Sequence, residues 1–200
     1  MEADTDFYLA YVPERIAPGK ALQEFVEIPR LIGGIGPQST RIAAELFRTV
    51  CKKIVETDAT SAEIAKLAEN TYRDVNIAFA NQLALICEHC GADVTEVIKL
   101  ANTHPRVNIH MPGPGAGGPC LPKDPYLLLD SSLLRNYNII TISRRMNDNM
   151  PKYIVKSIVQ ALKRTGKNVE TSKVAILGTA YKGNVDDARQ SPAEPIINRL

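Results

Sequence analysis

The sequence predicts a mainly α-helical fold, with a central helical dimerisation domain flanked by incomplete α/β, Rossmann-like pieces. The first observation is that residues 61–90 contain neither Pro nor Gly and carry a broad apolar stripe. The second is a strand-then-helix pattern near each end, over residues 30–50 and 173–194. We therefore place domain boundaries near residues 58 and 168, which divide the chain into 1–58, 59–168 and 169–200.

Composition is that of an ordinary globular chain, with 44% hydrophobic and 23% charged residues among 200. A net charge of +2 gives no electrostatic reason to expect a nucleic-acid or membrane partner. We identify no signal peptide and no apolar run near the ~18 residues that a membrane span needs. Four cysteines are too few for a disulfide scaffold of this size, so we expect a cytoplasmic protein with reduced thiols.

The first segment reads as α/β. Residues 7–12 are expected to form a short buried strand and residues 30–35 a second one, followed by a helix with apolar residues at helical spacing. Gly34-x-Gly36-x-x-Ser39 lacks the third Gly/Ala of a dinucleotide fingerprint, and we expect no acidic residue near position 60 to end a following strand. We interpret it as a strand-to-helix turn, and expect the chain to begin inside a domain.

The long helix is expected over about residues 61–90, after a capping box at Thr60 and Glu63. Its length, roughly 45 Å, is typical of a helix that spans two layers or forms a dimer seam. Lys66, Asn70 and Arg73 fall on one face. A solvated face is one interpretation; the Asn, and the lack of an acid four residues after Lys66, favour a ligand-facing row.

Cys87 and Cys90 share a helix face, but there is no second Cys-x-x-Cys, so we expect packed thiols and no metal site. Asp93 is expected to cap a second helix that ends near residue 102. Residues 103–107 then read as extended, which would put His104 and Arg106 on one side as an anion contact.

Residues 111–125 contain five Pro and four Gly, so they cannot form a regular element. Cys120 comes just before a helix start and close to Lys123, surroundings that lower a thiol pKa and favour the nucleophilic thiolate. Asp124 adds a carboxylate four residues later. The alternative is a structural turn with an incidental buried cysteine.

The remaining chain is expected to form helices, followed by the first strand and helix of a second α/β domain. Tyr126, Leu127, Leu128 and Leu134 are expected in a core helix, and a helical stretch from about 140 is expected to be interrupted by Pro151 and to end at Gly166. Residues 173–178 read as a buried strand. A loop to Gln190 and a helix capped by Ser191 follow.

Four motifs, spread in order over nearly the whole chain, resemble the UDP-glucose/UDP-N-acetylmannosamine dehydrogenase family. They are residues 12–19 (Val-Pro-Glu-Arg-Ile-Ala-Pro-Gly), 66–70 (Lys-Leu-Ala-Glu-Asn), 113–124 (Gly-Pro-Gly-Ala-Gly-Gly-Pro-Cys-Leu-Pro-Lys-Asp) and 178–192 (from Gly-Thr-Ala-Tyr-Lys to Gln-Ser-Pro). The resemblance implies NAD-dependent, four-electron oxidation of a UDP-sugar C6 alcohol to the carboxylate. It also implies the tail of an NAD-binding domain, a central domain that dimerises through helix 61–90, and the truncated start of a UDP-binding domain.

The resemblance also implies residue roles. Cys120 would be the nucleophile, Lys66 and Asn70 would stabilise the oxyanion, Asp124 would help proton transfer and hydrolysis, and Glu14 would activate water. Lys123 and Arg189 would lie on the NAD side. The residues expected to line the UDP-sugar site, with Arg106 supplied by the partner subunit, are Arg15, Ile16, Arg73, His104, Arg106, Gly117, Tyr181 and Lys182.

Residues 13–16, 72–81 and 104–108 resemble the N-acetylmannosamine branch of the family, whereas Pro119 and Gly183 depart from its usual pattern. UDP-glucose and UDP-N-acetylglucosamine therefore stay open as substrates. A non-catalytic helical dimerisation module is the alternative of another class, and a hydroxyacid-type dehydrogenase is disfavoured by the loop around Cys120. We expect a fragment of a dehydrogenase that does not turn over by itself.

Overall fold

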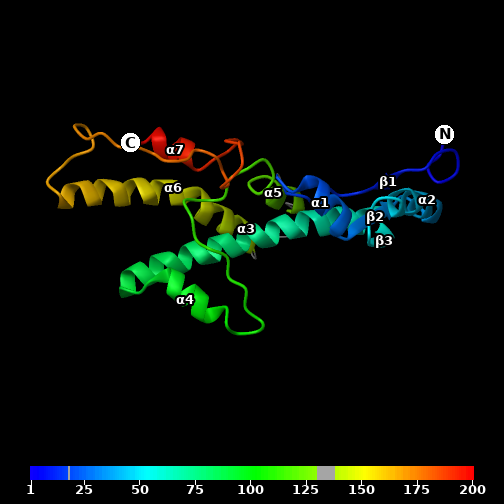
Figure 1. The fold of residues 1–200 in the computed structure, drawn as a ribbon, viewed down its shortest axis with the longest axis horizontal. Helices are drawn as coiled ribbons and strands as arrows, with labels where there is room; N and C mark the ends of the chain where they lie inside the picture. The colour runs from blue at the N-terminus through cyan, green and yellow to red at the C-terminus, as the bar shows by residue number, and fades with distance from the viewer. Residues whose placement is uncertain (18, 130–137) are drawn as a thin grey trace. The chain divides into compact units, whose positions relative to one another are not determined.

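A computed structural model describes residues 1–17, 19–129 and 138–200. The structure divides into two compact units, Met1–Glu69 and Asn70–Leu200, whose elements are labelled in Figure 1. The predicted fold class, mainly helical with one long helix and a small α/β piece, is confirmed. Leu134 lies outside the described residues. In the described ranges no helix combines the length and the apolar composition needed to cross a membrane.

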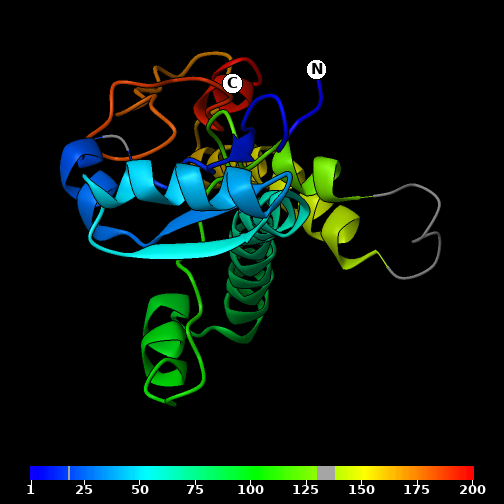
Figure 2. The same cartoon turned by 90° about the vertical axis from the view of Figure 1, so that its right-hand side faces the viewer.

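The first unit contains a sheet in the order β1-β2-β3. Strand β1 (Ala10–Tyr11) is antiparallel to β2 (Arg30–Gly34), and β3 (Ile54–Asp58) is parallel to β2. Helix α1 (Ala21–Glu27) precedes β2, and α2 (Pro37–Arg48) makes the crossover between β2 and β3. Helix α2 lies over one face of the sheet (Figure 2). The arrangement β2-α2-β3 is a βαβ unit.

Three points of the sequence analysis of this unit are corrected. The first strand is much shorter than residues 7–12, and α1 and β3 were not foreseen. Strand β3 has only Ile54 and Val55 as apolar residues, so its pairing with β2, and no local pattern, makes it a strand. Because Asp58 ends β3, the expectation that no acidic residue would end a strand near position 60 is wrong.

Helix α3 (Ala59–Cys90) is the long helix that the sequence predicts. It begins earlier than expected, because the cap is Asp58 and not Thr60. The Asp58 carboxylate accepts hydrogen bonds from the Ser61 backbone N–H at 2.9 Å and from the Ser61 hydroxyl at 2.6 Å. These bonds lower the pKa of the exposed Asp58 carboxyl.

Helix α4 (Val94–Ala101) is capped by Asp93, whose side chain accepts from Thr95 N at 2.8 Å, as predicted. The expected extended stretch after α4 is a turn, in which Val107 N donates to His104 O at 3.0 Å. The Asn102 side chain stabilises this loop, because it accepts from Ile109 N at 2.7 Å and donates to Ile109 O at 3.0 Å. Figure 1 shows α4 turning back from the end of α3.

The second unit also contains α5 (Asp124–Leu128), α6 (Ile139–Arg164) and α7 (Ala193–Ile197). The predicted core position of Tyr126 and Leu127 is wrong, because these side chains are exposed on a helix of only five residues. The predicted strand at residues 173–178 is also wrong. A buried parallel strand needs neighbours on both sides, and the described residues of this unit contribute no strand to the sheet.

Helix α6 continues through Pro151, so the expected interruption there is wrong. Proline has no N–H to donate to the carbonyl four residues earlier, which belongs to Asn147. Gly115 approaches this carbonyl, since a Cβ atom added to Gly115 would lie 3.0 Å from Asn147 O. Gly115 therefore lies close to the carbonyl for which Pro151 cannot be the donor.

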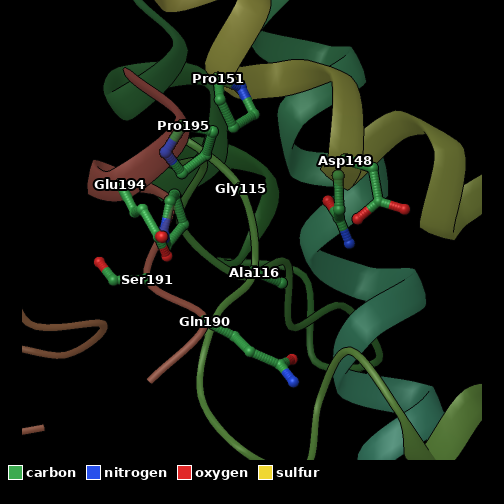
Figure 3. A pocket seen from close by; sticks show the side chains of 10 residues that line it. Gly115, Ala116, Asp148, Pro151, Gln190, Ser191, Glu194 and Pro195 are labelled. Carbon is green, nitrogen blue, oxygen red and sulfur yellow. The ribbon is translucent and has the colours of Figure 1, made fainter. Parts of the chain in front are cut away.

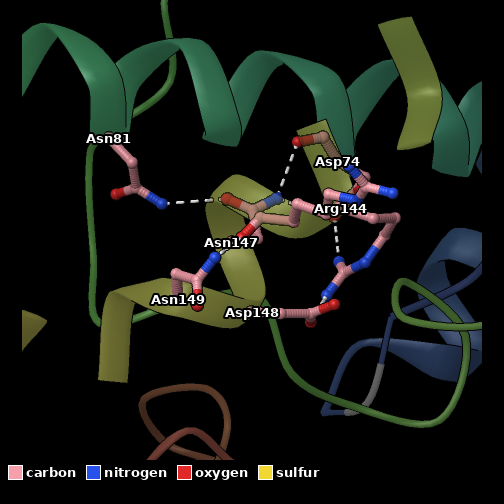
Figure 4. Close-up of polar contacts among 7 residues, drawn as sticks. Asp74, Asn81, Arg144, Asn147, Asp148 and Asn149 are labelled. Atoms are coloured by element: carbon pink, nitrogen blue, oxygen red, sulfur yellow. Dashed lines mark hydrogen bonds and ion pairs between the residues drawn. The ribbon is translucent and has the colours of Figure 1, made fainter. Parts of the chain in front are cut away.

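A buried polar network joins α3 to α6 (Figure 4). Arg144 Nη1 pairs with Asp74 Oδ1, and both side chains are at most 1% exposed. Asn147 Nδ2 donates to Asp74 Oδ1 at 2.9 Å and to Asp74 O at 3.0 Å. Asn81 Nδ2 donates to Asn147 Oδ1 at 2.9 Å. Arg144 Nη2 pairs with Asp148, whose side chain is 56% exposed.

Burial raises the pKa of Asp74, while the charge of Arg144 and the hydrogen bonds from Asn147 and Arg144 act in the opposite direction. Asp74 Oδ2 and Arg144 Nε have no hydrogen-bond partner in the described part of the chain. A buried pair of this kind carries a large desolvation cost that its remaining bonds offset. Losing one partner should therefore be costly.

We predict that Asp74→Asn lowers the free energy of unfolding by about 3–5 kcal/mol, because it leaves the buried Arg144 guanidinium without its buried counter-charge. The matched variant Asp148→Asn removes the exposed carboxylate from the same arginine and should cost at most about 1 kcal/mol. Urea denaturation followed by circular dichroism measures both. Equal losses in the two variants would contradict the assignment of the buried pair as the stabilising one.

Candidate active site

The cysteine loop, residues 111–125, is irregular up to α5, as the sequence predicts. Amide side chains of α3 fasten its beginning: Asn76 Oδ1 accepts from His110 N at 2.9 Å, and Asn81 Oδ1 accepts from Gly113 N at 2.8 Å. Asn81 also bonds Asn147. The start of the loop is therefore fixed to the same network that holds α3 and α6 together.

The middle of the cysteine loop packs against the segment of residues 179–192. Gly118 N donates to Arg189 O at 3.1 Å. A Cβ atom added to Gly117 would lie 2.7 Å from Gln190 O, and one added to Gly118 (φ +93°) would lie 3.0 Å from the Tyr181 ring. Only glycine allows this close approach. Two motifs far apart in the sequence, with Gly117, Tyr181 and Arg189, are thereby brought together.

Cys120 has an exposed thiol, so the alternative of an incidental buried cysteine does not describe it. Its carbonyl accepts from the N–H groups of Lys123 and Asp124, both at 2.9 Å, in the turn that leads into α5. The Asp124 carboxylate accepts from Asn70 Nδ2 at 2.6 Å. Two hydrogen bonds thus link Asn70 to Asp124 and Asp124 to the Cys120 backbone.

Arg189 forms a fork with Asp187, its Nε and Nη2 atoms donating to the carboxylate at 3.0, 3.1 and 2.6 Å. These bonds lower the pKa of Asp187 to about 2. They also raise the pKa of Arg189, with smaller contributions from Tyr181 and Cys120. The sequence reasoning missed Asp187, although an acid two residues before an arginine in a loop is a local signal for such a pair.

His110 is a second residue that the sequence reasoning missed, although it comes directly before the cysteine loop. Its ring lies edge-on to Tyr72, with the ring centroids 6.3 Å apart. Burial lowers the pKa of His110, and the charge of Arg73 lowers it further. The Arg73 side chain is itself exposed.

The remaining candidates are divided between the units. Glu14, Arg15, Ile16 and Lys66 belong to the first unit. Glu14 is exposed and its Oε1 accepts from Ile16 N, while the Arg15 guanidinium is bonded to Glu69 and to Pro29 O. In the second unit, five exposed basic candidates have no ion-pair partner in the described ranges, namely Arg73, His104, Arg106, Lys123 and Lys182.

Figure 3 shows a cavity of about 200 Å³ in the second unit. It is lined by Gly115 and Ala116 of the cysteine loop, by α6 around Pro151, and by the segment that begins at Gln190. Its lining includes none of the predicted site residues. The cavity therefore adjoins the candidate site without containing it.

The turn at Gly34 and Gly36 does not present a free helix end for a dinucleotide. At the start of α2, Asp4 accepts from Ser39 N at 2.5 Å and from Gln38 N at 3.3 Å, and the hydrogen bonds with Ser39 lower the pKa of Asp4. The interpretation as a strand-to-helix turn agrees with this geometry. Among the described residues, no group of three or more His, Cys, Asp or Glu could hold a metal ion.

Comparison with known proteins defines the class. Residues 60–149 match the central domain of the UDP-glucose/GDP-mannose dehydrogenase family, and residues 1–51 match its NAD binding domain. These matches together cover more than half of the chain, which therefore belongs to this family of dehydrogenases.

Individual relatives within this family show which of its members the chain is similar to. The chain is 48% identical to a UDP-N-acetyl-D-mannosamine dehydrogenase of Methanocaldococcus jannaschii, over 100% of its own length and 45% of the relative's. The structure of the Pyrococcus horikoshii UDP-D-ManNAc dehydrogenase covers 98% of the chain with a TM-score of 0.93 and 47% identity, and 47% of that structure is matched. An NDP-N-acetyl-D-galactosaminuronic acid dehydrogenase of Ralstonia solanacearum is 41% identical over 98% of the chain and 46% of its own length. The chain thus spans about half the length of the curated relatives it matches.

We predict that folding stability falls as the pH drops below about 6.5, the ordinary pKa of histidine. Because the folded-state pKa of His110 is lowered, the unfolded chain binds its proton first, and stability is lost as the pH falls through the folded value. Thermal unfolding between pH 7.5 and 5.0 measures this slope, which should be shallower in His110→Gln. A His110→Gln variant that keeps the wild-type slope would contradict the prediction.

Proposed function

We propose that this chain is part of a longer enzyme that oxidises the C6 alcohol of UDP-N-acetylmannosamine to the carboxylate, using NAD in a four-electron reaction. The observation that carries the proposal is the pairing of Asn70 with Asp124 at 2.6 Å, four residues after an exposed cysteine. The relatives named UDP-N-acetyl-D-mannosamine dehydrogenase support the substrate. Since the chain spans 45% of such a relative, we propose that the 200 residues alone do not turn over.

The covalent step belongs to Cys120. When bound, NAD supplies the hydride acceptor for both oxidations. The Cys120 sulfur forms a C–S bond to the aldehyde that the first oxidation leaves, giving a thiohemiacetal, and the second oxidation converts this adduct into a thioester. Water then attacks the thioester, the C–S bond breaks, and the carboxylate and the thiol are released.

Asn70 and Lys66 have the chemistry to stabilise the oxyanion that develops in the thiohemiacetal and hydrolysis steps. Four residues apart on α3, they share a helix face, and both are N–H donors, which such a site needs. One Asn70 amide proton is used by Asp124, and that bond orients the amide. Asp124 and Glu14 would move the protons, with Glu14 activating the water.

The UDP diphosphate requires cationic and hydrogen-bonding partners. The pyrophosphate of NAD has the same requirement. Lys123 and Arg189 are exposed cations at the cysteine loop and the adjoining segment, so we assign their charge to the NAD pyrophosphate. For the UDP-sugar we propose Ile16, Arg73, His104, Gly117, Tyr181 and Lys182, together with Arg106 from a partner subunit.

We propose a homodimer formed through α3. Tyr72, Phe79 and Ile86 recur every seven residues on this helix, and each is more than half exposed. Large apolar side chains at this spacing form a continuous stripe. A second copy of the same stripe would bury these side chains with matching chemistry, whereas water contact over this length is unfavourable.

In the longer enzyme, Cys120→Ser should lower the rate of NADH formation by at least about 10³-fold, since the hydroxyl cannot replace the thiolate as nucleophile. Wild-type enzyme should yield about two NADH per UDP-N-acetylmannosamine, as a four-electron oxidation demands. Absorbance at the NADH band measures both quantities. Cys90→Ser removes the other exposed thiol and should leave the rate unchanged; full activity of Cys120→Ser would refute the covalent mechanism.

Phe79→Glu should convert the dimer into a monomer at micromolar concentration, because it places a charge in the apolar stripe. Size-exclusion chromatography with light scattering measures the mass, and circular dichroism checks that the helix content is kept. Leu46→Glu changes an exposed apolar residue of α2 instead and should leave the mass unchanged. A Phe79→Glu protein that stays dimeric would exclude this face of α3 as the interface.

A further inference from the structure

The loop of residues 13–17 in the first unit is held from three sides. Arg30, which is 3% exposed, donates from Nη1 to Pro13 O at 3.4 Å and lies over the Phe25 ring at 4.4 Å. At the other end, Ala17 N donates to Glu24 Oε2 at 2.6 Å. Both ends of the loop are thus fixed by side chains that belong to α1 and to the start of β2.

Arg15 provides the third attachment, in the middle of the loop. Its Nε donates to Glu69 Oε2 at 3.2 Å and its Nη2 lies 2.7 Å from Glu69 Oε1, a two-point contact between guanidinium and carboxylate. Its Nη1 donates to Pro29 O at 2.6 Å. All three guanidinium nitrogens therefore already have acceptors within the unit, and the side chains of Arg15 and Glu69 are only 23% and 35% exposed.

Glu69, the partner of Arg15, lies on α3 between the two proposed oxyanion donors. It comes three residues after Lys66 and one before Asn70. On the loop side, Arg15 directly follows Glu14, whose carboxylate accepts from Ile16 N and is oriented by the same turn. One ion pair thus joins the backbone that carries the proposed water-activating carboxylate to the helix that carries the proposed donors.

We infer that Arg15 is a positioning residue that acts through Glu69 and sets the place of Glu14, instead of binding the UDP-sugar itself. This inference rests on the proposed function, which supplies the role of Glu14. A bidentate pair fixes both the distance and the angle between guanidinium and carboxylate, whereas a single contact would leave the orientation of the loop on α3 undefined. Because a displacement of about 1 Å in a reacting group can cost on the order of 10²-fold in rate, the pair should influence turnover more than substrate affinity.

The test is a double-mutant cycle in the longer enzyme, with UDP-N-acetylmannosamine and NAD as substrates. Arg15→Gln and Glu69→Gln should each lower kcat by about tenfold and change KM by less than about twofold. The double variant should be no slower than either single one, because the two residues act as a unit. The exchanged pair, Arg15→Glu with Glu69→Arg, should recover part of kcat.

The surface pair Arg48 and Glu56 is the matched control, since it joins the same residue types in the same unit with side chains 52% and 43% exposed. Its double variant should keep kcat. A direct ligand role is shown instead if Arg15→Gln raises KM about tenfold while Glu69→Gln behaves as wild type, and this result would overturn the inference.

A second measurement separates this inference from the proposed function. The unfolding temperature should fall by about 2–4 °C in each single variant, with the double variant losing less than the sum. If the wild-type enzyme oxidises no UDP-sugar, the proposed function fails whatever the melting curves show. If the enzyme is active but the melting and kinetic effects simply add, the positioning role of Arg15 fails alone.

Discussion

The second unit depends on the buried ion pair between Asp74 and Arg144. Two charges placed where neither is more than 1% exposed are tolerable only while they hold each other and their hydrogen bonds. Asn147 donates hydrogen bonds to Asp74 and accepts one from Asn81. Asn81 in turn accepts from Gly113 N at the start of the cysteine loop. Removing Arg144 would leave Asp74 without a counter-charge, and removing Asp74 would leave Arg144 only the exposed Asp148. The intact pair therefore fixes α3, α6 and the loop as one arrangement.

The second constraint is the absence of side chains at Gly117 and Gly118. With a Cβ atom, either residue would collide with Gln190 or the Tyr181 ring, so the loop could not close on the segment that bears Arg189. The two constraints act at successive points, Gly113 and Gly118. Cys120 follows directly, with its carbonyl held by the first turn of α5, which explains how a loop rich in glycine can present a thiol at a defined place.

Local chemistry decided which elements could be predicted. Helix α3 was foreseen because residues 61–90 lack any breaker, and α4 because Asp93 caps it. Strands were harder to predict, because a strand exists only where a neighbour pairs with it. Strand β3 was missed for this reason, and the strand expected at 173–178 is absent for the same reason. For the site, the sequence singled out Cys120, Asn70 and Asp124 by motif. It could not show that Arg15 contacts Glu69, because 54 residues separate them.

The cations of the site fall into two groups. Arg15, Arg144 and Arg189 each have a carboxylate partner, whereas Lys66, Arg73, Lys123, Arg106 and Lys182 have no ion-pair partner within the described ranges. Carboxylates already hold the guanidinium groups of Arg15 and Arg144, and an anionic ligand would have to displace them to reach these arginines. Arg189 differs because its side chain is 70% exposed, so its charge still suits the pyrophosphate of NAD. An unpaired cation gives its full charge to a diphosphate. This division is the physical reason to separate residues that build the site from residues that bind in it.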